Sequence, residues 1–473
     1  MAMILHAASE LTPLAKTGGL GDVLSALPAE QRILGNKVAC VLPFYHDVDK
    51  RLPQKPRREL SIKVPVGGEE IDAQIYSGRL ANGLVVFLVQ YDPFFKRPEL
   101  YGENNRDYPD NVRRFIFFSK AVVQLARHVR PIPQILHVHD WQTALVPAFV
   151  KAAGLPFKTV LTIHNLAFQG QFPGYEFALT NLPLGYFHAE GLEMHGGINF
   201  LKGGIKLADC VTTVSPRYAV EIQTEEYGCG LAQVLRARSA DGSLVGILNG
   251  IDTAAWNPAS DPLIPENYGI HNMSGKKKCK AALLKEFKLT GVDKPLFVSI
   301  GRLTEQKGWH FTLGLIDRIV ALGGNLVLLG TGSQALEQGL KEAATRYPKS
   351  VGVKIGFDEE LAHRIEAGGD FFLMPSRYEP CGLNQMYSLR YGTIPIVHKV
   401  GGLSDTVQEG EGYDNGLVFE PFELDAYSKA IERAFKLYND TKRFTAVRQR
   451  GMQMDLSWRR SAEAYCKLYS SLL

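Results

Sequence analysis

Residues 16–22 read Lys16-Thr17-Gly18-Gly19-Leu20-Gly21-Asp22, and they follow the apolar run Ile4-Leu5-His6-Ala7-Ala8, which predicts the first strand of an α/β sheet. A Gly-rich turn between a strand and a helix lets backbone N–H groups approach an anion closely, and the helix N-terminus adds partial positive charge. The glycine spacing matches neither Gly-x-Gly-x-x-Gly nor a P-loop, so it indicates neither of these nucleotide sites. Taken alone, the segment is also compatible with a tight β–α turn.

Size and composition indicate a soluble protein of more than one domain. The chain has 473 residues, enough for about two or three domains with separate cores, and 45% of them are hydrophobic and 22% charged. The net charge of +4 is nearly balanced, so we expect no nucleic acid and no membrane as a partner. No stretch approaches the roughly 18 apolar residues of a membrane span. The sequence predicts no particular oligomeric state.

The six cysteines are scattered without a Cys-x-x-Cys pair, which indicates a reducing compartment and neither a zinc site nor a disulfide framework. The N-terminus enters a predicted strand almost at once, without the pattern of a signal or transit peptide. We therefore expect a cytoplasmic protein, or one of the plastid stroma or granule if a transit peptide has been removed.

Strands and helices alternate along the chain, which predicts parallel sheets with helices on both faces. In the first half we expect a helix at 112–129 and strands at 38–42, 85–89, 135–138, 159–163 and, closing the series, 211–214. In the second half we expect helices at 311–322 and 383–391 and strands at 296–300, 326–329, 353–355, 371–374, 394–397 and 417–419.

The Pro-containing stretch 243–265 predicts a boundary between two α/β domains, at 1–245 and 246–455. We expect the lysine-rich run 272–280 to be an exposed loop and helix start with a solvated face. Polar motifs follow many of the predicted strands, and open parallel sheets bind ligands outside the carboxyl ends of their strands. If the two carboxyl-end surfaces face each other, the motifs line one cleft.

Further motifs follow in a fixed order, namely His137-Val138-His139-Asp140-Trp141, Thr162-Ile163-His164-Asn165-Leu166, Asn249-Gly250-Ile251-Asp252, Arg302 with Lys307, Glu379-Pro380-Cys381-Gly382-Leu383 and Gly401-Gly402-Leu403. With residues 16–22, this order and spacing resembles the bacterial glycogen synthase and plant starch synthase family over essentially the whole chain. The family consists of retaining glucosyltransferases that use ADP-glucose.

The resemblance implies two doubly wound Rossmann-like domains facing a cleft, the glycosyltransferase B architecture. The first domain would be the starch synthase catalytic domain on the acceptor side, completed by the C-terminal helix 456–473, and the second would bind the nucleotide sugar. The implied reaction transfers glucose from ADP-glucose to the non-reducing end of an α-1,4-glucan, such as glycogen, starch or a malto-oligosaccharide, with retention of configuration. It implies no cofactor and no metal.

The resemblance also implies roles for individual residues. The catalytic residues would be Asp140, His164, Arg302, Lys307 and Glu379. The substrate-binding residues would be Lys16, Gly18, Gly19, Asp22, Asn249, Phe357, Cys381, Gly382, Leu383 and Asn384. Arg302 and Lys307 suit a leaving diphosphate, because a guanidinium fork and a compact ammonium can neutralise its charge without a metal. Alternatively, they are solvated surface cations.

Glu379 cannot bind phosphate, so we expect it to accept hydrogen bonds from sugar hydroxyls and to support positive charge on the sugar ring. The N–H groups of Leu383 and Asn384, at a predicted helix start, would point at a phosphate. Cys381 is equally well explained as a small buried side chain, and Asn249 as a turn former. The resemblance also implies that Phe357, at a position where the family often has Tyr, stacks on the adenine.

The sequence His137-x-His139-Asp140 is compatible with metal ligands, but alternate residues of a strand point to opposite faces. His137 and His139 would share one face and Asp140 would point away unless the strand has ended, so we expect no metal. The aromatic side chains of 94–98 and Trp141 would pack either against glucan rings or in the core.

Two other functions remain open on the sequence alone. The same fold could use UDP-glucose or a small-sugar acceptor, which the Lys16-Thr17-Gly18-Gly19 segment disfavours as a mark of glycogen and starch synthases. The chain could instead be a non-catalytic glucan-binding relative, although a relative without activity would be free to lose Lys16, His164 and Glu379.

Overall fold

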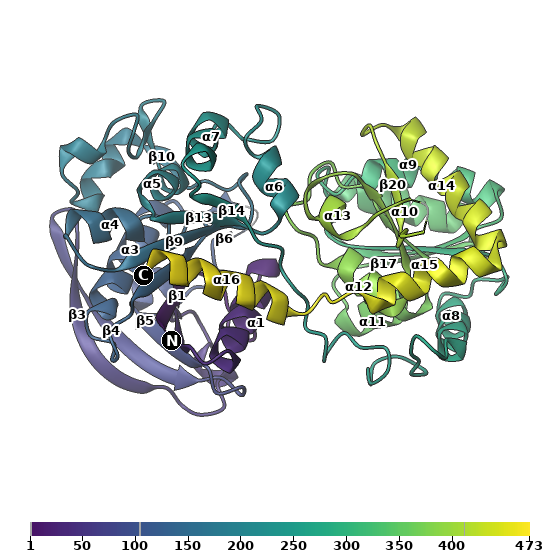
Figure 1. Ribbon diagram of the computed structural model, residues 1–473, viewed down its shortest axis with the longest axis horizontal. Helices are drawn as coiled ribbons and strands as arrows, with labels where there is room; N and C mark the ends of the chain where they lie inside the picture. Colours follow the sequence, from purple (N-terminus) through teal and green to yellow (C-terminus); the bar gives the residue numbers. More distant parts are fainter. Residues whose placement is uncertain (1, 104–105, 411) are drawn as a thin grey trace. The chain divides into compact units, whose positions relative to one another are not determined.

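A computed structural model describes residues 2–103, 106–410 and 412–473, and the chain divides into two compact units. Unit 1 comprises Met1–Asn249 and Trp458–Leu473, and unit 2 comprises Gly250–Ser457. Each unit has a mainly parallel sheet covered by helices (Figure 1). The predicted α/β class with two doubly wound, Rossmann-like domains is confirmed.

The main sheet of unit 1 contains β1 (Met3–Ala7), β2 (Lys37–Pro43), β3 (Arg57–Val66), β4 (Glu69–Arg79), β5 (Val85–Gln90), β8 (Ile135–His139), β9 (Lys158–Ile163), β13 (Cys210–Thr213) and β14 (Leu244–Gly246). Their order across the sheet is β14-β13-β9-β8-β1-β2-β5-β4-β3. The strands from β14 to β5 are parallel, and β4 and β3 continue the sheet as an antiparallel hairpin.

The remaining elements of unit 1 are helices and short strands. The helices are α1 (Gly19–Ile33), α2 (Asp92–Phe95), α3 (Asn111–Ala126), α4 (Val146–Ala152), α5 (Phe200–Leu207), α6 (Pro216–Glu221), α7 (Ala232–Ala240), α16 (Trp458–Leu472) and the 3-10 helices Asp49–Arg51, Gly174–Thr180 and Leu184–Tyr186. The short strands are β6 (Gly102–Glu103), β7 (Arg106–Asp107), β10 (Gln171–Pro173), β11 (Glu193–Met194) and β12 (Gly197–Asn199).

Unit 2 contains a parallel sheet in the order β17-β16-β15-β18-β19-β20. These strands are β15 (Leu296–Ile300), β16 (Asn325–Gly330), β17 (Val351–Ile355), β18 (Phe371–Met374), β19 (Ile394–His398) and β20 (Leu417–Phe419). Its helices are α8 (Ser274–Glu286), α9 (Trp309–Ala321), α10 (Gln334–Arg346), α11 (Glu359–Gly368), α12 (Asn384–Tyr391), α13 (Gly401–Thr406), α14 (Leu424–Asn439) and α15 (Thr441–Gln453).

Each sheet has one point where the strand order reverses. In unit 1 the chain places β2 to β5 on one side of β1, with β3 at the edge of the sheet, and then crosses to the other side of β1 with β8. In unit 2 the same reversal separates β15 from β18. Loops leaving the two strands at such a point diverge and open a crevice at the carboxyl edge. The segments after β1, β8, β15 and β18 carry most of the motifs that the sequence singled out.

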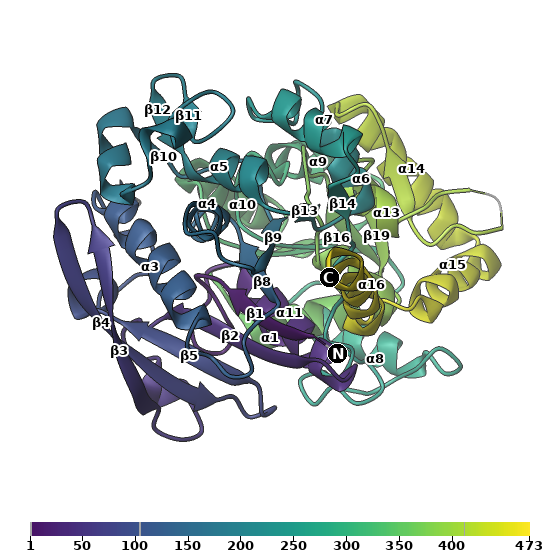
Figure 2. The same ribbon diagram turned by 60° about the vertical axis from the view of Figure 1, so that its left-hand side comes forward.

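The C-terminal helix α16 belongs to unit 1, where it packs against α1 beside the central strands (Figures 1 and 2). Tyr465 and Tyr469 of this helix are buried with Trp458 in the core of that unit. Residues more than 400 positions apart, such as Gln31 and Tyr469, are therefore hydrogen-bonded.

Two features of unit 1 differ from the prediction. The strand predicted at 211–214 does not close the series, because β14 adds a further parallel strand beyond β13. The hairpin of β3 and β4 was not predicted, although β3 alternates buried and exposed residues, with Ile62, Val64 and Val66 inside. This period of two is the usual signal of a half-buried strand.

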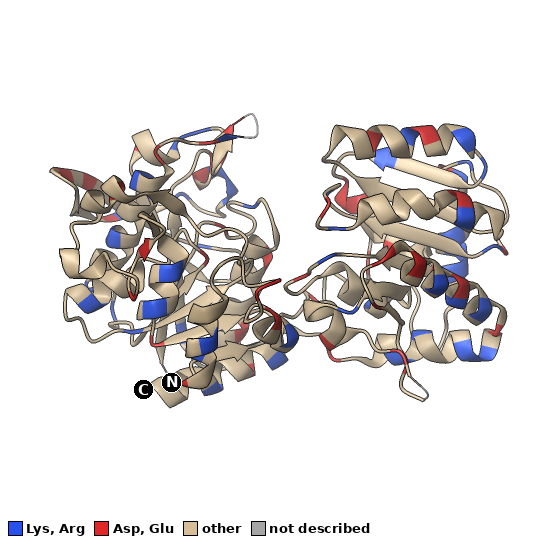
Figure 3. Cartoon of the chain, turned by 90° about the horizontal axis from the view of Figure 1, so that it is seen from above, with Lys and Arg blue, Asp and Glu red and all other residues tan. Residues whose placement is uncertain are grey.

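Charged residues are interspersed over each unit (Figure 3). In the described part of the chain, no helix is both long and apolar enough to cross a membrane.

The prediction of a solvated face for the lysine-rich run 272–280 is wrong for two of its lysines. Lys276 and Lys280, one helical turn apart in α8, are only 3% and 6% exposed. Lys276 Nζ donates to the carbonyl oxygens of Glu366 and Ala367 and to Oγ1 of Thr393, at 2.7–3.2 Å. Lys280 forms an ion pair with the buried Asp370, with 2.6 Å between Nζ and Oδ2. The sequence does not show which lysines are buried. The aliphatic part of a lysine side chain is apolar, and its ammonium group can bond acceptors inside the protein.

This burial predicts a stability difference between adjacent lysines. Lys276→Met should cost about 3 kcal/mol, because it removes three buried hydrogen bonds from the ammonium group. Lys277→Met, at an exposed position of the same helix, should change stability by less than about 0.5 kcal/mol. Urea unfolding of the three proteins measures the difference, and equal midpoints for the two variants would contradict it.

Candidate active site

Glu10 organises the Gly-rich loop that follows β1. Its carboxylate accepts hydrogen bonds from the N–H of Thr17 (2.7 Å), the hydroxyl of Thr17 (2.6 Å) and the N–H of Gly18 (3.1 Å). Tyr101 donates to the same carboxylate at 2.8 Å. The sequence predicted that backbone N–H groups of this loop approach a ligand. Those of Thr17 and Gly18 are instead bonded within the protein, because Glu10 already supplies the anion.

Lys16 and Asp22 flank this loop and form an ion pair of 2.7 Å between Nζ and Oδ1. Gly19 begins α1, with Gly18 as the preceding residue in extended conformation. Lys16 lines a polar cavity of about 130 Å³ together with Leu14, Ala15, Thr17, Tyr45, His46, Arg51 and residues 97–100. Both charged groups of the pair remain partly exposed, so the ammonium group can reach a ligand in this cavity.

Asp140 lies directly after β8 and holds the neighbouring loop. Its backbone has a φ of 56°, so the strand has ended and the side chain turns away from the direction of His139. Oδ1 of Asp140 accepts the N–H of His164 at 2.7 Å. Burial raises the pKa of Asp140 to about 7, and the backbone N–H groups of His164 and Asn165 oppose this rise. Asp140 and His164, which follow the paired strands β8 and β9, are therefore directly bonded.

The ring of His164 is hydrogen-bonded to the ring of His139, with 3.0 Å between Nε2 of His164 and Nδ1 of His139. Burial lowers the pKa of His164 to about 3, so the ring is neutral near pH 7. Asp140 thus holds the backbone of this residue and His139 holds its side chain.

His6, His137 and His139 lie close enough together to hold a metal ion. The predicted shared face of His137 and His139 is confirmed, with ring centroids 4.2 Å apart. Both nitrogens of each ring, however, already have protein partners. His6 bonds Gln31 and His139, His137 bonds Tyr469 and Thr162, and His139 bonds His6 and His164. We therefore interpret the cluster as a hydrogen-bonded layer and not as a metal site.

In unit 2, Lys307 and Glu379 form a close ion pair at the switch point. Nζ of Lys307 lies 2.5 Å from Oε2 of Glu379, whose side chain is buried. The hydroxyl of Ser376 donates to the same oxygen at 3.1 Å. Arg302, at the end of β15, is exposed, and among the described residues its side chain has no hydrogen-bond or ion-pair partner. The structure thus places Arg302, Lys307 and Glu379 around the loops after β15 and β18.

The glycines of the Gly401-Gly402 motif allow two backbone segments to approach closely. A Cβ at Gly401 would lie 1.9 Å from the carbonyl oxygen of Glu379, and one at Gly402 would lie 2.0 Å from that of Cys381. The N–H of Gly402 donates to the carbonyl of Glu379 at 3.1 Å. The N-terminus of α13 therefore fixes the backbone that carries Glu379, and any side chain at these positions would displace it.

The other predicted residues of unit 2 lie near the start of α12. The helix begins at Asn384, after Leu383, and Nδ2 of Asn384 donates to the carbonyl of Ile300 at 2.7 Å, which ties the helix to the end of β15. Gly382 has a φ of 74°, a conformation that favours glycine, and Cys381 is buried. The structure brings these residues together with Glu379.

Two further predicted residues lie apart in sequence. Phe357 follows β17 and is 85% exposed. Asn249 is buried and is the last residue of the main segment of unit 1.

The alternatives left open for residues 94–98 and Trp141 are decided in part. Phe94 and Phe95 are buried in the core of unit 1, so they offer no surface to a glucan. Trp141 is half-buried and packs edge-on against Phe115, with ring centroids 4.9 Å apart. Aromatic residues in a sequence predict burial more readily than sugar stacking, because the core takes most of them.

Sequence reasoning missed Glu10, His6 and Gln31. Glu10 had one signal, since it is an acidic residue directly after a buried strand. His6 lies inside β1 and Gln31 inside α1, where neither spacing nor composition distinguishes a hydrogen-bonding residue from an ordinary one.

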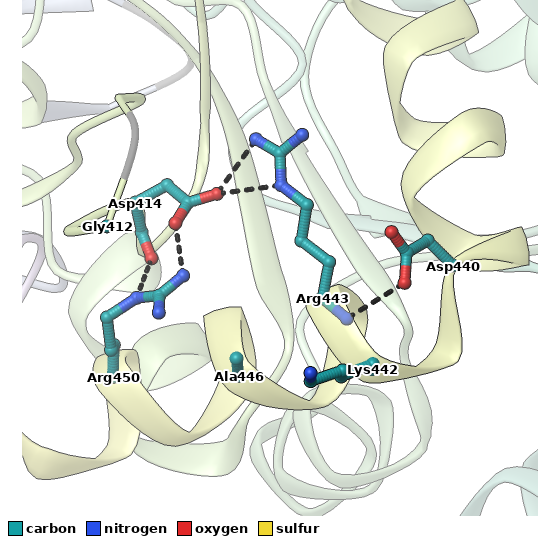
Figure 4. A pocket seen from close by; sticks show the side chains of 7 residues that line it. All are labelled: Gly412, Asp414, Asp440, Lys442, Arg443, Ala446 and Arg450. Carbon is teal, nitrogen blue, oxygen red and sulfur yellow. Dashed lines mark hydrogen bonds and ion pairs between the residues drawn. The ribbon is translucent and has the colours of Figure 1, made fainter.

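A cavity of about 400 Å³ in unit 2 is lined by none of the predicted site residues. The cavity is lined by both signs of charge, and Arg443 and Arg450 both converge on the carboxylate of Asp414 (Figure 4). The cavity therefore offers no uncompensated cluster of one sign, and we assign no ligand to it.

Comparison with known proteins identifies the family of the chain. The starch synthase catalytic domain model matches residues 3–237, and the model for group 1 glycosyl transferases matches residues 283–449. A glycogen synthase from Myxococcus xanthus is 46% identical, with 99% of each chain covered. The chain belongs to the glycogen synthase and starch synthase family. A second member, the glycogen synthase of Opitutus terrae, is 44% identical over 99% of this chain and all of its own.

Solved structures place the fold in the same family. The catalytic domain of starch synthase IV from Arabidopsis thaliana, bound to ADP and acarbose, superposes with a TM-score of 0.89 at 34% identity, and 99% of each chain is covered. A sucrose-phosphate synthase from Thermosynechococcus elongatus has a TM-score of 0.64 at 18% identity, which shows a common fold only. As a glycogen or starch synthase, the chain is a glucosyltransferase.

The buried histidine layer predicts that unit 1 loses stability steeply on acidification. Burial lowers the pKa of His6 to about 4 and of His164 to about 3, and it holds the pKa of His137 and His139 well below the usual value. Histidines of the unfolded chain take up protons near pH 6.5, so the stability present above that pH is lost as the pH falls. Each of the four histidines lowers the free energy of unfolding by about 1.4 kcal/mol for each pH unit of acidification. The raised pKa of Asp140 has the opposite effect and cancels the contribution of one histidine. We therefore expect a net loss of about 4 kcal/mol in the free energy of unfolding between pH 6 and pH 5.

Urea midpoints at pH 7, 6 and 5 measure this dependence. The change in the free energy of unfolding with pH reports the number of protons taken up on unfolding. His137→Phe should reduce this number by about one, whereas His46→Gln, at an exposed site, should leave it unchanged. Equal wild-type midpoints at pH 7 and pH 5 would contradict the prediction.

Proposed function

We propose that this glucosyltransferase uses ADP-glucose and transfers its glucose to the non-reducing end of an α-1,4-glucan with retention of configuration. The observation that carries the proposal is the Lys307–Glu379 pair of 2.5 Å at the switch point of unit 2, beside the exposed Arg302. The ADP and acarbose bound to the related starch synthase IV support a nucleotide sugar and a glucan as substrates.

In this proposal the donor diphosphate binds to unit 2. Arg302 and Lys307 neutralise the charge that develops on the diphosphate as its bond to the glucose carbon breaks. Glu379, which cannot contact phosphate favourably, faces the sugar and supports positive charge on its ring. Phe357 supports the assignment of an adenine nucleotide, because an exposed aromatic ring is available for stacking.

Asp140 and His164 of unit 1 contact the sugar. Retaining glycosidases use two carboxyl groups about 5 Å apart, one of them as the nucleophile. We propose a front-face route instead, in which the leaving phosphate takes the proton of the attacking glucan hydroxyl as the new bond forms on the same face. A His164 ring with a pKa lowered to about 3 fits this route, because so weakly basic a ring leaves the proton to the phosphate.

A transfer assay with labelled ADP-glucose and UDP-glucose, and with glycogen and free glucose as acceptors, tests the proposal. We expect ADP-glucose with glycogen to give the highest kcat/KM. A higher kcat/KM with UDP-glucose or with free glucose would favour the alternative substrates, and the absence of transfer from either donor would favour a glucan-binding protein without activity.

Removing either phosphate-binding cation should lower turnover by about 100-fold, the effect typical of losing one transition-state charge contact. Arg302→Ala and Lys307→Ala test this in the same assay. Arg318→Ala is the matched control, because it removes an exposed cation of the same unit that pairs with Glu432. Near-wild-type kcat in both test variants would refute the assignment of the cations.

We further propose that the reaction needs no metal or other cofactor, since two cations can neutralise the diphosphate. Activity in metal-stripped buffer with EDTA should then equal activity in buffer with Mg²⁺. Loss of activity in EDTA that added Mg²⁺ or Mn²⁺ reverses would refute this.

A further inference from the structure

A line of buried hydrogen bonds connects helix α1 to the ring of His164. Oε1 of Gln31 lies 2.8 Å from Nε2 of His6, Nδ1 of His6 lies 3.1 Å from Nε2 of His139, and Nδ1 of His139 lies 3.0 Å from Nε2 of His164. On its other side, Nε2 of Gln31 donates to the hydroxyl of Tyr469 at 3.0 Å. The line of hydrogen bonds therefore begins at the Gln31 amide, whose oxygen faces His6 and whose nitrogen faces Tyr469.

The sheet explains why these side chains meet. Residues 6 and 137 are paired in register on β1 and β8, and residue 139 is two positions further along β8, on the same face. Helices α1 and α16 pack against each other and supply Gln31 and Tyr469 to this layer. His6, Gln31 and His139 are fully buried, and the ring nitrogens of His6 and His139 bond their neighbours in the layer.

The order of donors and acceptors then determines which nitrogen of each histidine ring carries the proton. An amide oxygen only accepts, so Nε2 of His6 carries the proton. The other nitrogen of a neutral imidazole is an acceptor, so Nδ1 of His6 accepts from Nε2–H of His139, and Nδ1 of His139 accepts from Nε2–H of His164. The remaining nitrogen of His164, Nδ1, has no hydrogen-bond partner among the described residues and is left with a lone pair.

A ring has one donor and one acceptor nitrogen only when it is neutral, and burial keeps these rings neutral. It lowers the pKa of His6 to about 4, that of His164 to about 3 and that of His139 well below 6.5.

We propose that Gln31, acting through His6 and His139, holds His164 as the Nε2–H tautomer, so that Nδ1 of His164 accepts a hydrogen bond from a sugar hydroxyl of the substrate. This inference rests on the proposed contact of His164 with the sugar. It makes Gln31, His6 and His139 positioning residues. It also assigns the side chain of His164 the role of acceptor, and not of donor, toward a sugar hydroxyl.

The proposal predicts that a distant substitution reverses the tautomer. In Gln31→Met the acceptor for Nε2–H of His6 is gone, and a buried unpaired N–H is more costly than an unpaired nitrogen lone pair. The protons therefore shift along the line, each ring donates from Nδ1, and His164 becomes the Nδ1–H tautomer. His6→Phe removes the acceptor of His139 and should have the same effect.

Nitrogen-15 NMR of protein with labelled histidine rings reads the tautomer directly, and the loss of signals in His164→Gln assigns the ring. We expect Nε2–H in the wild type and Nδ1–H in Gln31→Met and His6→Phe. Tyr469→Phe is the control, because Gln31 keeps its oxygen on His6, and it should retain Nε2–H. A wild type with Nδ1–H, or an unchanged tautomer in both test variants, would overturn the relay.

Activity tests the second half of the inference. Reversal of the tautomer should lower kcat/KM for glucan transfer by about tenfold, equal to about 1.4 kcal/mol, while Tyr469→Phe stays within about threefold. A reversed tautomer with unchanged kcat/KM would overturn the acceptor role of Nδ1. If the wild type transferred no glucose, the proposed function would fail, and the NMR result would still decide whether the relay exists.

Discussion

In a parallel sheet every strand ends at the same edge, and both units depend on this constraint. Polar residues that follow different strands are brought together there without any contact in sequence, as Asp140 and His164 are by β8 and β9. The reversal of strand order then selects which loops diverge enough to admit a ligand. In unit 2 this edge carries Lys307 and Glu379, 72 residues apart yet paired at 2.5 Å.

The interior adds a second constraint, because a buried polar group must find its partner inside the protein. Unit 1 meets it with a continuous layer of histidine, glutamine, threonine and tyrosine side chains under α1 and α16. The layer explains the position of the C-terminal helix in physical terms. Without Tyr469, Gln31 and His137 would each lose a hydrogen-bond partner in a region closed to water.

The sequence was sufficient for the fold class, for most strands and for the residues at strand ends, since burial patterns and Gly-containing turns are local signals. It was insufficient where the deciding contact is distant. The buried state of Lys276 depends on carbonyl groups some 90 residues away, and the role of Glu10 depends on a loop that curls back onto it. The sequence does not predict the hydrogen bond between His6 and Gln31 either, because it depends on how α1 packs against β1. The hairpin of β3 and β4 is different, since its alternation was present in the sequence and was overlooked.

The two units differ in how they handle charge, and this difference suits a transfer between sugars. Unit 2 supplies fixed charges of both signs, an exposed Arg302 and the Lys307–Glu379 pair, which match a reaction that separates a diphosphate from a positively charged sugar ring. Unit 1 supplies a neutral histidine, and the residues behind it are neutral as well. In the proposed reaction, a charged imidazole would attract the diphosphate away from Arg302 and Lys307. Burial prevents this near neutral pH, because it lowers the pKa of His164 to about 3 and so disfavours the charged form of the ring.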